Sequence, residues 1–181
     1  MNLLSIDLSL RGCGVIVLPT NWGGHWHNIH HQTIGEKLGN DATPQQKLGR
    51  LVRIASEILA IAEMFRPDHA VVEHYSFNAR GHHMDLGELG GVVKHQLATK
   101  LGLVAQPVVA SAARKVIMGS VPRKGAKDAT LAYLRRIGMP LEWTDDEADA
   151  FVCANFASSA LGGFAFAMTP VDAKKVKRRA A

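Results

Sequence analysis

Short runs of apolar residues, typical of β-strands, fill the first third of the chain. Two of these runs, LLSI and VIVL, flank a short segment with Gly12 and Gly14, which predicts a β-hairpin over residues 2–9 and 13–18. A third strand is expected at residues 25–34, after the turn TNWGG. Asp7 interrupts the first apolar run, and a carboxylate is costly to bury unless something pairs with it. Asp7 therefore either faces water at the end of the strand or has a partner that offsets the cost of burying its carboxylate.

A long amphipathic helix is predicted to follow these strands. Thr43 is a favourable N-cap, and Pro44 suits the first helical position. Apolar residues then recur at spacings of three and four, and the pattern ends before Pro67. The expected apolar face consists of Leu48, Leu51, Val52, Ala55, Ile58, Leu59, Ala62 and Phe65.

Strands and helices alternate in the rest of the chain. A buried strand at residues 70–72 carries Glu73 at its C-terminal end, and LVAQPVV predicts another strand. The expected helices cover residues 85–101, residues 111–118 with Ser111 as the cap, residues 126–137, and the segment TDDEADAFVCANFASSAL. Three strands followed by this alternation indicate an α/β layered fold with a mixed sheet.

Length and composition describe an ordinary globular chain. The 181 residues suit one domain, with 47% hydrophobic and 20% charged residues. No apolar run reaches the roughly 18 residues of a membrane span, and no secretory signal is evident. Cys13 and Cys153 lie among apolar residues, which favours free buried thiols in a reducing compartment. We therefore expect a cytoplasmic protein.

The charge of the chain favours a polyanionic partner. The formal net charge is +5 and the pI is about 9.4. One basic group consists of Arg114, Lys115, Arg123, Lys124 and Lys127. A second run, Lys174, Lys175, Lys177, Arg178 and Arg179, reads as a solvated tail that could add non-specific affinity for phosphates.

Acidic residues are concentrated at the start of the last predicted helix. Thr144 and Glu147 form a capping-box pattern, and Asp145 is favourable near the positive end of the helix dipole. Asp146 and Asp149 are three residues apart and share a helix face. Asp146 could be only a favourable charge near the positive end of the helix dipole. Asp149 lies among apolar residues and would be destabilising without a partner.

Acids in this chain thus fall on three separate elements. Asp7 and Glu73 belong to strands, and Asp146 and Asp149 to the last helix. Carboxylates that converge repel one another, and a divalent cation removes the repulsion. Oxygen ligands favour Mg²⁺ or Mn²⁺, and two such ions can hold the attacking water and the leaving oxygen of a phosphodiester. We hypothesise a metal-dependent nuclease.

These residues resemble the RuvC family of Holliday-junction resolvases, within the RNase H-like superfamily. The resemblance covers residues 2 to 160 and is carried by SIDLSLRGCGVIVL, AVVEHYSF, VVASAARKVIMG and DDEADAFVCANFA. It implies an RNase H-like fold, a five-stranded mixed sheet with helices on both faces. It also implies a nuclease domain over residues 1–165 and a flexible basic tail over residues 166–181. The first motif departs from the family, because Leu8 replaces its usual proline.

The resemblance also assigns the site. Two Mg²⁺ ions, for which Mn²⁺ would substitute, would be held by Asp7, Glu73, Asp146 and Asp149, with Asp145 and Glu147 as alternatives to Asp146. Phe77, or else Tyr75, would be the aromatic residue that helps open the junction; either could instead be a core aromatic. The residues that would contact DNA phosphates are Arg114, Lys115, Lys124 and Lys127, each of which could instead be a solvated surface charge.

The activity implied is paired symmetric nicking of four-way junctions by a homodimer. A dimer would present two sites to two strands, and the helix at residues 85–101, with Gly87, Gly90 and Gly91, is a candidate interface; such glycines equally suit close packing inside a monomer. The alternatives are an RNase H-like nuclease acting on RNA–DNA hybrids or structured RNA, and a junction-binding protein without cleavage. A branch-migration partner is not identified, and the altered first motif favours a phage or divergent bacterial source.

Histidines form two groups. His25, His27 and His31 would share one side of a strand, and without nearby cysteines or carboxylates an exposed face is favoured over a zinc site. His74, His82 and His83 follow Glu73. One of these three could lie near the scissile phosphate or contact DNA.

Overall fold

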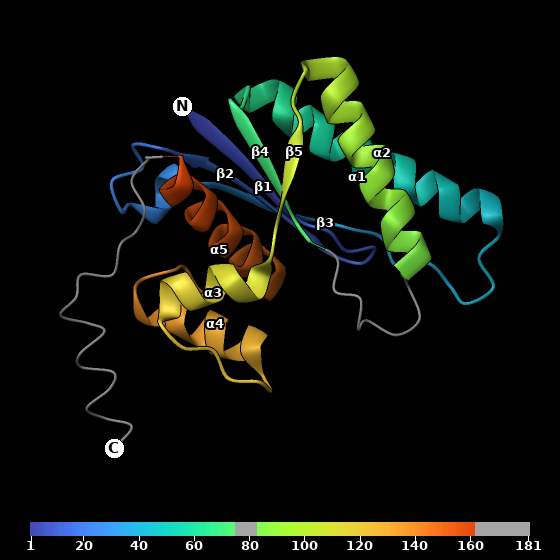
Figure 1. The fold of residues 1–181 in the computed structure, drawn as a ribbon. Coiled ribbons are helices and arrows are strands. Elements are labelled where there is room, and N and C mark those ends of the chain that lie inside the picture. The colour runs from blue at the N-terminus through green and yellow to red at the C-terminus, as the bar shows by residue number, and fades with distance from the viewer. Residues whose placement is uncertain (75–82, 162–181) are drawn as a thin grey trace.

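A mixed five-stranded sheet forms the centre of the protein, as predicted (Figure 1). The computed structural model describes residues 1–74 and 83–161. The strands are β1 (Asn2–Asp7), β2 (Cys13–Pro19), β3 (His30–Ile34), β4 (His69–Glu73) and β5 (Ala105–Val108). Their order is β3-β2-β1-β4-β5. The predicted hairpin pairs β1 and β2 antiparallel, and β4 and β5 run parallel to β1.

Helices cover both faces of the sheet (Figure 1). On one face lie α1 (Pro44–Phe65) and α2 (His83–Leu101), and on the other lie α3 (Ala110–Met118), α4 (Ala126–Arg136) and α5 (Asp145–Ala160). Each layer has its own hydrophobic core, one built on α1 and α2 and one on the other three helices. No helix in the described part of the chain is long and apolar enough to span a membrane.

The alternation of side chains along β1 and β4 determines where the acids point. Leu4 and Ile6 pack in the core beneath α1 and α2, whereas Leu3 packs in the core beneath α5. Asp7 has the same parity as Leu3 and therefore lies on the α5 side. Val71 packs in the α5 core as well, so Glu73 shares that face.

The first long helix has the predicted ends and most of the predicted buried face, including Leu51, Ala55, Ile58 and Ala62. Thr43 and Gln46 form a capping box, and the helix ends at Phe65 with Arg66 in a left-handed conformation, φ 45°. Leu48 and Val52, expected on the apolar face, are 58% and 45% exposed, and Arg50 is buried instead.

Three further sequence predictions need correction. The strand expected at residues 25–34 begins only at His30, because Trp26–Asn28 form a 3-10 turn. Ser111 is not a helix cap, since α3 begins at Ala110. Close packing at the α2 glycines does not occur at Gly87 or Gly91, where an added Cβ would meet nothing within 4 Å in the described part of the chain.

Candidate metal centre

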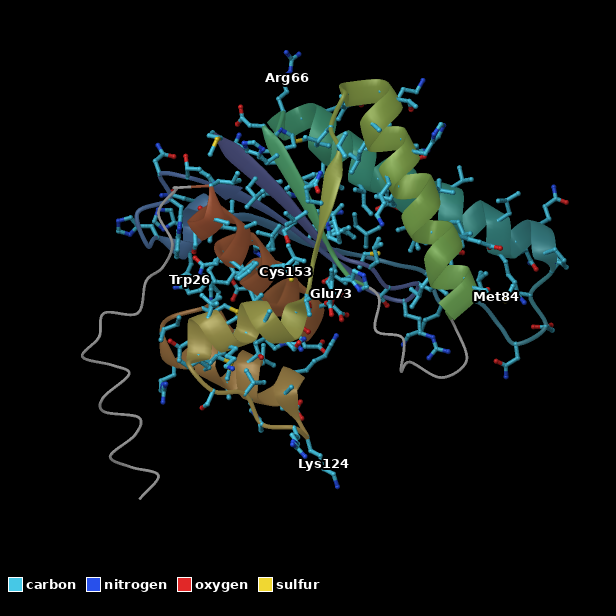
Figure 2. All side chains as sticks on the ribbon, in the orientation of Figure 1. Trp26, Arg66, Glu73, Met84, Lys124 and Cys153 are labelled. Carbon is cyan, nitrogen blue, oxygen red and sulfur yellow. The ribbon has the colours of Figure 1, made fainter. Side chains whose placement is uncertain are left out.

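Three carboxylates converge where β1 and β4 end beneath α5. Asp7 and Glu73 are the last residues of these adjacent parallel strands, and Asp149 lies in the second turn of α5. One ligand atom from each of the three residues lies within 4.8 Å of the others. Asp7 and Asp149 are buried and Glu73 is half-buried; Figure 2 shows Glu73 at the end of its strand, beside α5. The sheet thus brings together the residues that the sequence analysis singled out.

Glycines allow α5 to come so close to the sheet. Gly14 pairs with Asp7 across the hairpin. A Cβ at Gly14 would lie 2.0 Å from the carbonyl oxygen of Asp146, a distance that no side chain could tolerate. A Cβ at Gly12 would lie 3.0 Å from the Asp146 carboxylate. These two glycines therefore let the first turn of α5 rest against the strand that carries the site.

The capping box at the start of α5 decides which acid faces the cluster. The Glu147 N–H donates to the Thr144 hydroxyl at 3.2 Å, and the Thr144 N–H donates to the Glu147 carboxylate at 2.9 Å. Glu147 is thereby held in the cap, with His31 Nδ1 3.4 Å away, while Asp145 is exposed. Asp146 is the acid of this turn that lies toward Asp7 and Asp149, because it shares the Lys127 ammonium with both.

Lys127, from the first turn of α4, connects the cluster to Asp146. Its Nζ lies 2.9 Å from Asp146, 3.4 Å from Asp149 and 3.5 Å from Asp7. Partial burial opposes the charge of this lysine, but the attraction of Asp7, Asp146 and Asp149 outweighs it and raises the lysine pKa. Lys127 therefore acts as a built-in cation at the mouth of the acid cluster.

Arg114 of α3 holds Asp149 from the other side. Its guanidinium approaches both carboxylate oxygens of Asp149, at 3.0 Å through Nε and at 2.6 Å through a terminal nitrogen. Burial opposes the charge of Arg114, but the hydrogen bond and charge of Asp149 raise its pKa. The sequence predicted Arg114 as a phosphate contact and gave no sign of this pair, because residues 35 apart on two helices show no spacing signal.

The two other predicted phosphate contacts are free on the surface. Lys115 and Lys124 are exposed, and neither makes an ion pair within the described residues. Lys124 projects from the loop before α4, away from the sheet (Figure 2). Their position suits an electrostatic contact with a polyanion.

The acids repel one another strongly. Burial, and then the negative charge of Glu73, raise the pKa of Asp7 well above its ordinary value, and Lys127 only partly opposes this. One oxygen of Glu73 is buried without a hydrogen bond, and the buried Oδ2 atoms of Asp7 and Asp149 have only their ion pairs with Lys127 and Arg114. Among the described residues, the ion pairs of these four carboxylates come from two cations, Arg114 and Lys127, which leaves an excess of negative charge in that part of the chain.

This donor set fits a hard divalent cation. All candidate ligands are carboxylate oxygens, the type that Mg²⁺ and Mn²⁺ prefer over zinc. The buried Glu73 oxygen that has no hydrogen bond would gain a partner from such an ion. Asp146 is at the rim, with a side chain 23% exposed, so it could add a further ligand.

The histidine-rich segment forms no comparable centre. In the described part of the chain, only Asp7, Glu73 and Asp149 make a group that could hold a metal. His25 and His27 are exposed with rings 5.5 Å apart. His31 does not share their exposed face, because it stacks on Trp143 at 4.6 Å beside Glu147.

Several predicted residues lie outside the described residues. Phe77, Tyr75 and His82 belong to residues 75–82, and the basic tail to residues 162–181. His74 is exposed directly after Glu73, and its N–H donates to the Val108 carbonyl at 2.8 Å. His83 begins α2. The roles proposed for these residues stay predictions.

Comparison with known proteins gives a likeness of fold alone. No family model matches the chain, and no curated protein sequence matches it. RuvC of Thermus thermophilus superposes with a TM-score of 0.63 at 18% identity, over 90% of this chain and 98% of that one. The same protein in complex with a Holliday junction substrate gives 0.64 at 18% identity, over 90% and 96%.

A viral protein shows the same likeness at greater distance. Fowlpox virus resolvase in complex with Holliday junction DNA gives a TM-score of 0.52 at 11% identity, over 89% of this chain and 99% of that one. The chain thus spans nearly the whole length of these structures. Its fold is the RNase H-like fold of RuvC, with the five-stranded mixed sheet and two helical layers that the sequence predicts.

Proposed function

We propose that this protein is a metal-dependent, structure-selective endonuclease that resolves four-way DNA junctions by paired symmetric nicks. The observation that carries the proposal is the convergence of Asp7, Glu73 and Asp149, with ligand atoms within 4.8 Å of one another in a basic protein. The likeness in fold to RuvC and to fowlpox virus resolvase, both known in complex with Holliday junctions, supports this substrate.

The acids would act as metal ligands. Asp7, Glu73 and Asp149 would hold Mg²⁺, Asp146 would complete a site for two ions, and Mn²⁺ would substitute. When bound, the ions supply Lewis acidity that activates water and stabilises the leaving oxygen of a phosphodiester. No carboxylate needs to act as a general base.

The neighbouring cations would serve charge balance and substrate contact. Arg114 fixes the orientation of Asp149 through its two contacts. Lys127, half-exposed at the rim, would turn from the acids to a phosphate oxygen when metal neutralises the cluster. Lys115 and Lys124 would contact the DNA backbone and contribute affinity that depends on salt.

The assembly around the site is part of the proposal. Residues 1–165 would form the nuclease domain and residues 166–181 a basic tail. A homodimer would match the two-fold symmetry of a junction, with the exposed Gly87 and Gly91 face of α2 as the candidate contact. Phe77, or else Tyr75, would open the junction, and the protein would work in the cytoplasm.

A cleavage assay tests the proposal directly. The protein is incubated with a labelled four-way junction, a matched linear duplex and an RNA–DNA hybrid, with Mg²⁺ or with EDTA. We expect symmetric nicking of the junction alone, only with Mg²⁺, and no nicking by Asp7→Asn although that variant folds and binds the junction. Cleavage of the hybrid instead would mean that the same acids act on RNA in an RNA–DNA hybrid. Tight junction binding with no cleavage at any metal concentration would refute catalysis.

A further inference from the structure

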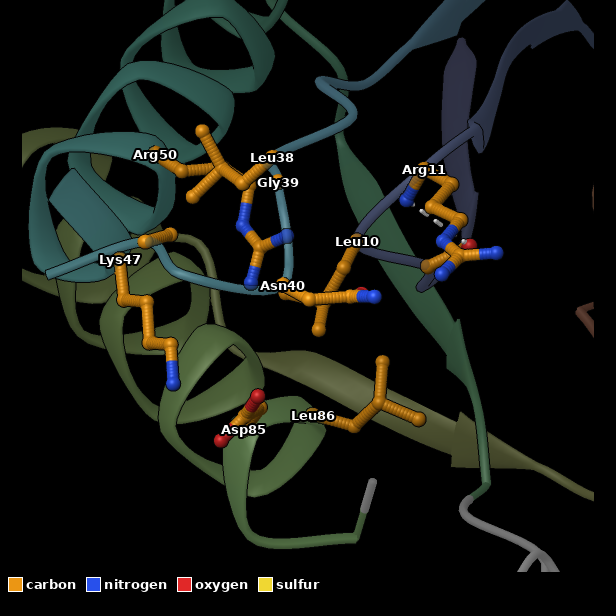
Figure 3. Close-up of a pocket in the computed structure, with 11 residues that line it drawn as sticks. Leu10, Arg11, Leu38, Gly39, Asn40, Lys47, Arg50, Asp85 and Leu86 are labelled. Atoms are coloured by element: carbon orange, nitrogen blue, oxygen red, sulfur yellow. Dashed lines mark hydrogen bonds between the residues drawn. The ribbon is translucent and has the colours of Figure 1, made fainter. Parts of the chain in front are cut away.

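A cavity lies at the same end of the sheet as the acid cluster, on the side of α1 and α2. Its volume is about 400 Å³. Its walls are the loop after β1, the segment that precedes α1, the first turns of α1 and the start of α2 (Figure 3). None of the four acids of the candidate metal centre lines it.

Arg50 is the unusual residue of this cavity. It is only 8% exposed, yet its Nε is buried without a hydrogen bond. It forms no ion pair with any residue in the ranges 1–74 and 83–161. Its guanidinium extends from α1 into the cavity toward Asn40 (Figure 3). A buried donor without a partner is costly, and the guanidinium opens into the cavity, so this arginine points to an anionic ligand.

The other charged residues that line the cavity are mostly positive as well. Arg11 and Lys47 add two positive charges to that of Arg50, and Asp85 is the acid among the lining residues. Asp85 makes no ion pair with Arg50 or Lys47 within the described residues, and it lies across the cavity from Arg50 (Figure 3). Positive charge therefore dominates, and Ser9 and Asn40 add polar groups at the wall.

Direct contacts hold one wall of the cavity, the loop after β1, against the segment that precedes α1. A Cβ at Gly35 would lie 2.3 Å from the Arg11 carbonyl oxygen, so the two backbone segments are in direct contact. The Glu36 N–H donates to the Leu10 carbonyl at 3.2 Å. The Glu36 carboxylate pairs with Arg53 of α1. A preformed site of this kind binds without the entropy cost of ordering a loop.

We propose that this cavity holds a backbone phosphate of the nucleic acid substrate, clamped by Arg50, Lys47 and Arg11. An arginine fork matches phosphate oxygens geometrically, and lysine adds a point charge. Arg11 follows Asp7 by four residues, so their Cα atoms are at most about 15 Å apart. The bound phosphate would lie a few nucleotides from the scissile bond. This inference rests on the proposed function for the identity of the anion.

Binding measurements on two variants test the clamp. Fluorescence anisotropy with a labelled four-way junction in EDTA gives Kd at several salt concentrations without cleavage. Arg50→Met and Lys47→Gln should each raise Kd about tenfold, as expected for lost hydrogen bonds to a charged group. Each should also lower the slope of log Kd against log salt by about one, the value for one phosphate. The control Lys100→Gln removes an exposed charge at the far end of α2 and should change neither quantity.

Thermal melting distinguishes a binding residue from a structural one. Arg50→Met should melt higher than the unaltered protein in phosphate-free buffer, because a buried donor without a partner is removed. Inorganic phosphate should raise the melting temperature of the unaltered protein above that in sodium chloride of equal ionic strength, and this gain should vanish in Arg50→Met. Lys47 is exposed, so Lys47→Gln carries the test even if Arg50→Met fails to fold.

The outcomes separate the two proposals. If the unaltered protein binds the junction and Lys47→Gln behaves like Lys100→Gln in both Kd and salt slope, the clamp is refuted while the proposed function stands. If the unaltered protein does not bind the junction, the proposed function fails. The phosphate-dependent melting then decides whether the cavity binds free phosphate, and its absence would refute the anion site altogether.

Discussion

Replacing Lys127 by methionine tests whether the protein carries its own substitute for a metal ion. The Lys127 ammonium lies between 2.9 and 3.5 Å from carboxylate oxygens of Asp146, Asp149 and Asp7. A divalent cation among the acids would compete with it for the same oxygens. Methionine keeps the length and helix propensity of lysine and removes only the charge.

The size of the effect follows from exposure. The Lys127 side chain is 46% exposed, so each of its ion pairs contributes about 0.2–1 kcal/mol. Taken together, the pairs give about 1.5 kcal/mol, which in a protein of this length corresponds to a fall in Tm of about 3–6 °C. In the unaltered protein, a bound Mg²⁺ would have to displace these ion pairs. Lys127→Met lacks them, so Mg²⁺ should bind about tenfold more tightly.

The assay combines melting in EDTA with calorimetric titration of Mg²⁺. We expect Lys127→Met to melt lower than the unaltered protein in EDTA and to gain more from saturating Mg²⁺. Lys124→Met is the matched control, because Lys124 is exposed three residues away. Unchanged or weaker Mg²⁺ binding by Lys127→Met would refute the competition between lysine and metal.

Three more predictions concern the charges around the site and the buried thiols. The folded-state pKa of Asp7 is raised above 3.8, so its contribution to stability is fully present below pH 3.8 and is lost as pH rises through the raised value. Asp7→Asn should therefore melt higher than the unaltered protein in EDTA at pH 7, with the gap closing in acid; a lower Tm at pH 7 would contradict the raised pKa. Arg114→Met leaves Asp149 buried without its arginine and should cost about 3–5 kcal/mol in urea unfolding, whereas equal loss in Lys115→Met would point to a general charge effect. Burial raises the pKa of Cys13 to about 12, so a thiol reagent at pH 8 should label it only after unfolding, and rapid labelling of the native protein would contradict its burial.

The sequence predicts well what depends on neighbours along the chain. Thr144 and Glu147 form the expected capping box, and the acid at the end of β4 was located correctly. The period-two alternation that brings Asp7 and Glu73 to one face is also a local property. Their convergence with Asp149 depends on the strand order, which places β4 beside β1 and which the α/β pattern did not specify; at the sequence level the convergence was a hypothesis.

The partners of charged residues could not be predicted in the same way. Arg50 lies among residues of mixed polarity in α1, and the segment that precedes the helix lines the same cavity, an arrangement that helical spacing does not reveal. Arg114 and Lys127 both read as surface cations in a basic cluster. Their contacts depend on how α3 and α4 are oriented over α5, which helical periodicity does not specify.

The ion pairs of Arg114 and Lys127 reduce the part of the positive net charge that is available to attract a polyanion. Arg114 and Lys127 are paired with the acid cluster, so they do not add freely to the attraction for a polyanion. They lower the mutual repulsion of the carboxylates, and this lets the chain fold around its acids before an ion arrives. Metal removal should consequently abolish cleavage while leaving a folded protein. Junction binding in EDTA would then depend on Lys115, Lys124 and the Arg50 cavity, whose charges are not engaged by the cluster.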